Sequence, residues 1–148
     1  MKNPSPLNNN FQIDKERAKL FYDQIGTVWC PAIRDYVICN RIGFQHLIRK
    51  GKVLRSQNEQ KSRLALVRYI EPILRSFTAF VVEEEREILH QTKIDSKYLS
   101  TLSRAHFWRL TEECDGLVIK LVIRQIKDNK KHFFSIFVKK QKVAQQVY

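Results

Sequence analysis

The chain has 148 residues, of which 43% are hydrophobic, so it is long enough for one domain with a buried core. Its 27 lysines and arginines against 15 aspartates and glutamates give a formal net charge of +12, which predicts a polyanionic partner, nucleic acid before a membrane surface. Three separated cysteines without a CxxC motif argue against a disulfide framework and a structural zinc site, and four glycines without a phosphate-loop motif argue against a nucleotide cofactor.

The ends of the chain differ from its middle. We expect one domain over residues 11–140, between a flexible tail at 1–10, rich in Pro, Ser and Asn, and a short tail at 141–148. No signal peptide or apolar segment of membrane-spanning length is present, which favours the cytoplasm. No pattern in the chain requires a cofactor or a metal.

The domain begins with a helix and two short strands. Asp14 is a candidate N-cap for a helix that ends at Gly26, with apolar residues at helical spacing between them. Residues 28–30 and 36–39 are rich in β-branched and aromatic side chains and are separated by Pro31, which indicates two strands or one interrupted strand.

Residues 41–50 have the pattern of a short helix with a cationic face. Phe44, Leu47 and Ile48 form its buried stripe, while His46 shares another face with Arg49 and Lys50. Repulsion from these two cations would lower the pKa of His46, and the same cations would hold a phosphate beside it.

The middle of the chain is helical, then extended. We expect a basic linker at 52–58 and a helix at 59–76, broken or kinked at Pro72, whose cations form a solvated face: Lys61, Arg63, Arg68 and Arg75. Residues 77–82 read as a strand, 83–87 as an acidic edge or helix start, and 93–103 as a turn. In the strand that follows, at 105–114, one side carries His106, Trp108 and Leu110, and the other carries Phe107, Arg109 and Thr111.

The C-terminal segment, 117–139, predicts a β-hairpin that turns at Asp128 and Asn129. This turn pairs Gln125 with His132, Ile123 with Phe134, Leu121 with Ile136 and Ile119 with Val138, which form one apolar face. The opposite face then carries Lys120, Val122, Arg124, Phe133, Ser135 and Phe137. We therefore expect an α+β fold in which helices pack on one face of an antiparallel β-sheet of about four strands, ending in a long β-hairpin.

Several of these side chains suit cleavage of an RNA phosphodiester without a metal. Such cleavage needs a base for the 2′-hydroxyl proton, an acid for the leaving oxygen and cations for the charge on phosphorus. His46 is the candidate for proton transfer, Arg124 and Lys120 for charge stabilisation, and Ser135 for orienting an oxygen. Further candidate RNA-binding residues are cationic or aromatic: Arg41, Arg49, Lys50, Trp108, Arg109, Phe133 and Phe137.

Five segments together resemble the phage-associated branch of the barnase, EndoU, colicin and RelE-like ribonuclease superfamily. They are YVICN at 36–40, the helix with His46, the segment IEPIL at 70–74, and the strands VIKLVIRQ and HFFSIFV. The resemblance covers about residues 28–139. It implies an α+β fold, metal-independent RNA cleavage through a cyclic phosphate, and use as a toxin or phage-borne effector. It assigns His46, Arg124 and Ser135 to the site, with Lys50 where a second histidine is expected, so His106 or His132 would supply the second acid or base.

The sequence therefore favours a small basic ribonuclease acting on RNA, such as tRNA or ribosome-bound message, with an inhibitor or antitoxin protein as a partner. A non-catalytic nucleic-acid-binding module that uses the same basic sheet face is the main alternative. A protein-interaction or antitoxin domain whose charge complements an acidic partner is the third.

Overall fold

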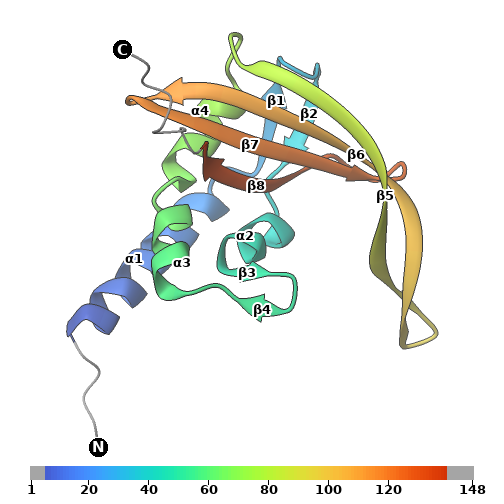
Figure 1. Ribbon diagram of the computed structural model, residues 1–148, viewed down its shortest axis with the longest axis horizontal. Helices are drawn as coiled ribbons and strands as arrows, with labels where there is room; N and C mark the ends of the chain where they lie inside the picture. Colours follow the sequence, from blue (N-terminus) through green and yellow to red (C-terminus); the bar gives the residue numbers. More distant parts are fainter. Residues whose placement is uncertain (1–5, 140–148) are drawn as a thin grey trace, which may run out of the picture.

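The computed structural model describes the chain from residue 6 to residue 139, and the side chains of residues 10–89 and 93–139 (Figure 1). Residues 1–5 and the C-terminal tail predicted at 141–148 lie outside the described residues. The helices are α1 (Pro6–Asp23), α2 (Arg41–Ile48), α3 (Gln57–Leu64), the 3-10 turn η1 (Val67–Tyr69) and α4 (Ile70–Leu74). The strands are β1 (Thr27–Cys30), β2 (Asp35–Ile38), β3 (Arg49–Lys50), β4 (Val53–Leu54), β5 (Phe80–Ile94), β6 (Lys97–Cys114), β7 (Leu117–Ile126) and β8 (His132–Val138).

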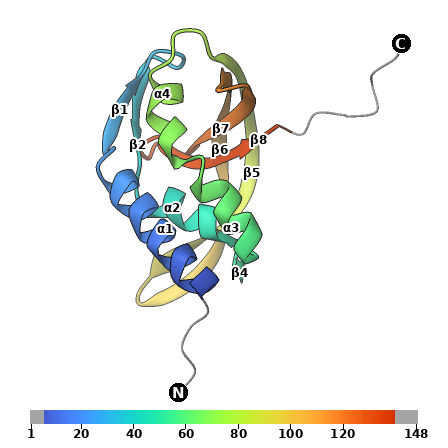
Figure 2. The same ribbon diagram turned by 90° about the vertical axis from the view of Figure 1, so that its left-hand side faces the viewer.

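The main sheet has six strands in the order β1-β2-β8-β7-β6-β5, and β3 and β4 form a separate two-stranded hairpin. All neighbours in the main sheet are antiparallel except β2 and β8, which are parallel and paired at Ile38 and His132. Figures 1 and 2 show α1, α3 and α4 together on one side of this sheet. The α+β class is confirmed, but the sheet is larger than the four strands we expected.

The additional sheet comes from the β5–β6 hairpin. The segments predicted as an acidic edge and a turn, 83–87 and 93–103, are instead parts of two continuous strands. The acidic residues are compatible with a strand because basic residues of β6 face them, and Arg109 Nη1 lies 2.6 Å from Glu84 Oε2. The turn is at Asp95 and Ser96, which both have positive φ angles. The outer part of the hairpin extends and curves beyond β7, which pairs with β6 only from Ala105 on (Figure 1).

The helices also differ from the expected boundaries. α1 begins at Pro6, inside the segment expected to be a tail, so Asp14 lies in the helix rather than at its cap. The helix expected over 59–76 consists of three pieces, α3, η1 and α4. Ser56 caps α3, since its hydroxyl accepts a hydrogen bond from the Glu59 backbone N–H.

One face of the main sheet packs against the helices. Its fully buried side chains include Leu110, Ile119, Leu121, Ile123, Phe133 and Ile136. α2 reaches this core at Gly43, where an added Cβ would lie 2.5 Å from both a ring carbon and the backbone oxygen of Phe133. The missing side chain lets α2 approach β8, and this close approach positions His46, three residues further along α2.

We predict that Gly43→Ala destabilises the protein by about 1–3 kcal/mol, because the new methyl group overlaps Phe133 and, at 2.7 Å, the Tyr22 hydroxyl. Urea unfolding followed by circular dichroism measures the free energy. Ile42→Ala, at an exposed position of the same helix, is the control and should change the stability by about 0.5 kcal/mol or less. Equal stability of Gly43→Ala and the wild-type protein would contradict the close packing of α2 on β8.

Candidate functional site

A β-bulge in β8 determines which side chains share a face with Arg124. From Ile119 to Val122 the hairpin has the predicted register, with Val122 opposite Ser135. The register then shifts between Val122 and Ile123, so that Phe133 pairs with Ile123 and His132 pairs with Arg124. The prediction that Phe134 packs in the core and Phe133 on the Arg124 face is therefore wrong, because the extra residue reverses the alternation.

The bulge brings His132 and Phe134 to Arg124. Arg124 Nε donates a hydrogen bond to His132 Nε2 at 3.1 Å. The guanidinium carbon of Arg124 lies 4.2 Å from the centroid of the Phe134 ring, a close cation–π contact. The loop between β7 and β8 is residues 127–131 rather than a two-residue turn, so the predicted pairing of Gln125 with His132 is also wrong.

The His46 ring contacts the same phenyl ring. The centroids of His46 and Phe134 are 4.3 Å apart. His46 and Arg124 therefore meet at one aromatic side chain, although they come from α2 and β7. The His46 Nδ1 atom is buried without a hydrogen-bond partner among the described residues, so packing rather than a carboxylate orients this ring.

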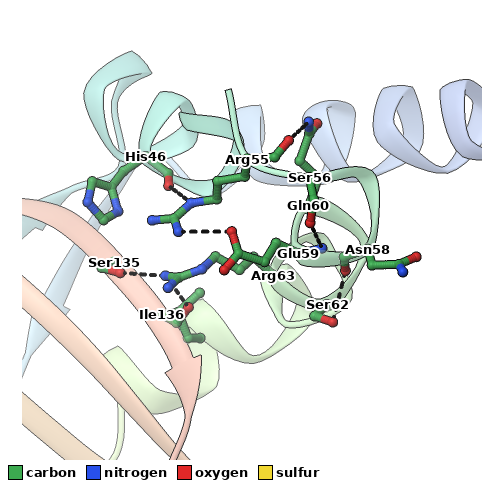
Figure 3. A network of polar contacts seen from close by, with 10 residues as sticks. All are labelled: His46, Arg55, Ser56, Asn58, Glu59, Gln60, Ser62, Arg63, Ser135 and Ile136. Atoms are coloured by element: carbon green, nitrogen blue, oxygen red, sulfur yellow. Dashed lines mark hydrogen bonds and ion pairs between the residues drawn. The ribbon is translucent and has the colours of Figure 1, made fainter. Parts of the chain in front are cut away.

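Two further arginines complete the site (Figure 3). Arg55, in the segment before α3, donates from Nε to the His46 carbonyl at 3.1 Å and forms a 3.6 Å ion pair with Glu59. Arg63, on α3, donates from Nη1 to the Ser135 hydroxyl at 3.0 Å and to the Ile136 carbonyl at 3.3 Å. We call His46, Arg55, Arg63, Arg124, His132, Phe134 and Ser135 the arginine–histidine cluster.

The side chains of the cluster are partly buried, and its arginines lower the pKa values of the two histidines. Burial, followed by repulsion from Arg55, Arg63 and Arg124, lowers the pKa of His46 from 6.5 to about 4. Burial and Arg124 lower the pKa of His132 to about 4 as well. Burial lowers the pKa of Arg124 only to about 10, so this guanidinium stays charged at neutral pH. The cluster thus holds three cations and two neutral imidazoles, an environment that attracts an anion.

The two histidines of the cluster have different roles available to them. His132 is 6% exposed, accepts from Arg124 and also hydrogen-bonds to the backbone of Lys130, so its ring serves to hold Arg124. In contrast to His132, His46 has a ring nitrogen, Nδ1, without a hydrogen-bond partner among the described residues. His106, the other candidate for a second acid or base, stacks on Trp108 with a centroid distance of 4.1 Å and contacts Glu83 and Glu85, away from the cluster.

The structure brings His46, Arg124, Ser135 and His132 together, and most of the other predicted residues lie apart from them. Lys120 is on the same face as Arg124 but four residues earlier in β7, about 13 Å along the strand. The cations Arg41, Arg49 and Lys50 are exposed. α2 ends at Ile48 and Arg49 has extended backbone, so the cations that lower the pKa of His46 are Arg55, Arg63 and Arg124 instead of Arg49 and Lys50.

The predicted aromatic residues have mixed outcomes. Trp108 and Phe133 are 5% and 0% exposed and belong to the helix-covered core, so neither is available for stacking on a base. Phe137 is on the Arg124 face, with the Arg63 guanidinium 5.8 Å from its ring centroid. Arg109 is on that face too, where it pairs with Glu84.

Sequence reasoning missed Arg55, Arg63 and Phe134. A weak signal existed for Arg63, since it follows the buried Gln60 by three residues and precedes the buried Leu64 on the same helix. The adjacent Phe133 and Phe134 interrupt strict alternation, as a bulge does. Arg55 lies in a polar segment without periodicity, and nothing local marks it as 6% exposed.

Comparison of the chain with protein-family models, with curated proteins and with solved structures found no significant match in any of the three. Within residues 6–139, no group of three or more His, Cys, Asp or Glu side chains has a metal-binding arrangement. No helix in this part of the chain has the length and apolarity needed to cross a membrane.

We predict that the protein loses stability as the pH falls from about 6.5 to about 4. In this window the unfolded chain binds protons on His46 and His132, whereas the folded chain does not, so acid favours unfolding. For each histidine, the pKa shift from 6.5 to about 4 corresponds to a loss of at most about 3 kcal/mol in the free energy of unfolding.

Urea unfolding at a series of pH values measures this dependence, and the double variant His46→Gln, His132→Gln is the control. The variant should show a much smaller loss across the same window. A wild-type stability that does not change between these pH values would show that the two imidazoles are not desolvated in solution.

Proposed function

We propose that the protein is a metal-independent endoribonuclease of the barnase, EndoU, colicin and RelE-like kind, with the arginine–histidine cluster as its active site. One observation carries the proposal: the convergence of a neutral imidazole, His46, and a charged guanidinium, Arg124, on the Phe134 ring, with Arg63 and Ser135 beside them. Cations for a phosphate and a base for a hydroxyl are two of the three requirements of this reaction, the third being an acid for the leaving oxygen.

Arg55 is buried and pairs with Glu59, so the guanidiniums of Arg124 and Arg63 are the two that bind the scissile phosphodiester. They offer N–H donors in the planar arrangement that suits phosphate oxygens, and their partial burial strengthens the attraction. Ser135 is held by Arg63 and orients either a phosphate oxygen or the 2′-hydroxyl. Charge that develops on phosphorus in the transition state is stabilised by the same cations.

His46 accepts the proton of the 2′-hydroxyl. The 2′-oxygen then attacks phosphorus, the bond from phosphorus to the 5′-oxygen breaks, and a cyclic phosphate and a 5′-hydroxyl result. The low pKa keeps His46 unprotonated at neutral pH, as a base must be. His132 and His106 are both engaged elsewhere, so in this proposal water gives the leaving oxygen its proton.

The proposed substrate is cytoplasmic RNA, with tRNA or ribosome-bound message as the natural targets. The net charge of +12 supports such a polyanionic partner. A ribonuclease of this kind is toxic to the cell that makes it, and we propose a toxin or phage-type effector restrained by an inhibitor protein.

A non-catalytic RNA-binding module is the second candidate. The observation that favours it is that neither His132 nor His106, the two candidates for the second acid or base, is free to protonate the leaving oxygen. Cations without proton transfer bind RNA but do not cleave it. The antitoxin alternative is weaker, because Glu83, Glu84 and Glu85 are used in contacts within the chain.

We predict that His46→Ala and Arg124→Ala each reduce cleavage of total RNA in EDTA by at least about 100-fold, the size expected for a lost base or a lost transition-state cation. Gel analysis of RNA fragments measures cleavage, and circular dichroism confirms folding. His106→Gln and Arg75→Ala lie outside the cluster and are the matched controls, which should cleave like the wild type.

Unchanged cleavage by both cluster variants would reject this active site. If the wild type cleaves no RNA but binds it with an affinity that falls steeply with salt, the binding module is the correct function.

We also predict a pH profile set by the depressed histidine. The ratio kcat/KM reports the free enzyme, so it should rise to half its maximum near the His46 pKa of about 4 and stay level toward neutral pH. An ordinary histidine base would give this limb at about 6.5 instead. A limb near the ordinary value would show that His46 is hydrated in the working enzyme.

A further inference from the structure

Trp29 and Tyr36 form an exposed aromatic pair at the edge of the main sheet. Their ring centroids are 5.0 Å apart, and the two side chains are 44% and 59% exposed. They are directly opposite each other in the β1–β2 pairing. Unlike isolated exposed apolar residues, two neighbouring rings form a continuous aromatic surface that suits a flat ligand.

The strand register places this pair on the same sheet face as the arginine–histidine cluster. Tyr36 precedes Ile38 by two residues, so their side chains share a face. Ile38 pairs with His132, which pairs with Arg124. The neighbours of Tyr36 and Ile38 confirm the alternation, since Val37 between them is fully buried in the core beneath the opposite face. The aromatic pair and the cluster are thus two parts of one surface.

A cavity beside Tyr36 reaches from β2 to the β7–β8 loop. It has a volume of about 400 Å³ and is lined by Tyr36 and Ile38 from β2 and by Gln125, Asn129 and Lys130 from the hairpin. Lys131 and Asp35 also line this cavity and form a 2.5 Å ion pair. The charge of the Asp35 carboxylate is therefore balanced by Lys131. Two exposed cations accompany the ring pair: Arg34 is in the turn between β1 and β2, and Lys130 lines the cavity together with Tyr36.

We propose that Trp29 and Tyr36 form a base-stacking subsite for an unpaired nucleotide of an RNA strand that also occupies the arginine–histidine cluster. Exposed aromatic rings flanked by cations are the arrangement that binds single strands, because every base has a face for stacking and every linkage has a charge. Bases inside a duplex cannot reach such rings. This inference rests on the proposed function and extends it, since it specifies single-stranded RNA as the substrate class.

Direct binding measurements test the subsite. The His46→Ala protein keeps the RNA intact, and in this background Trp29→Ala and Tyr36→Ala are compared by fluorescence anisotropy with a labelled single strand of about ten nucleotides. Each substitution should raise Kd by about 5- to 100-fold, the equivalent of one lost stacking contact. Binding to a blunt RNA duplex of equal length should change by less than about 2-fold, because only electrostatic contacts remain there.

Two further variants control for general effects. Phe77→Ala removes an aromatic side chain that is 90% exposed and lies outside this face, so it should bind the single strand like its parent. Trp29→Phe keeps a stacking ring and should retain most of the affinity.

Three results would overturn the subsite. The first is an unchanged single-strand Kd in both alanine variants, and the second is an equal loss for single strand and duplex. The third is a dimer that Trp29→Ala abolishes in analytical ultracentrifugation, since a second copy would then cover the rings. Because the assay measures binding in a protein without His46, a wild type that fails to cleave RNA rejects the proposed catalysis without deciding the subsite.

Discussion

Side-chain alternation along β8, and its interruption at Phe134, is the constraint on which the rest of the site depends. A regular strand would place His132 and Phe134 on the helix-covered face, as the unbulged pairing predicts. The extra residue sends Phe133 into the core, where it meets Gly43, and sends its neighbours to the face of Arg124. One irregular residue pair therefore supplies both the anchor for α2 and the ring on which His46 and Arg124 meet.

The arginines of the cluster also donate hydrogen bonds to backbone carbonyls that lack a partner strand or helix turn. β2 pairs with β8 only at His132, so within residues 6–139 no strand lies beside the carbonyl groups further along that edge of β8. α2 fills part of this space, and Arg63 donates to the Ile136 carbonyl. Arg55 in the same way satisfies the carbonyl of His46 near the end of α2. Each of these two arginines donates to a backbone carbonyl, which fixes its guanidinium, and the less buried Arg63 keeps further N–H groups for a ligand.

The sequence predicted the regular parts of this structure and missed those that depend on tertiary contacts. Alternation in 117–139 correctly placed Ile119, Leu121 and Ile123 in the core and Arg124 on the opposite face. The bulge was not predicted, because the expected pairing assumed a two-residue turn and a regular alternation beyond it. The β5–β6 hairpin was not predicted because the apolar residues of its outer half are mixed irregularly with polar ones and its turn, Asp95–Ser96, has no glycine. Arg55 is 6% exposed because it packs between the end of α2 and the start of α3, a contact that no periodic pattern in its own segment records.

Anion binding and proton affinity are coupled in this cluster. The second contribution to the low pKa of His46, after burial, is repulsion from Arg55, Arg63 and Arg124, and a bound phosphodiester would neutralise part of that charge. The pKa of His46 must then rise on binding, and by linkage the protonated protein must bind the anion more tightly than the neutral one. In the proposed reaction, a substrate would thereby make its own base stronger, and proton removal would depend on occupancy of the site. Without a bound anion, burial and the three guanidiniums keep the imidazole neutral.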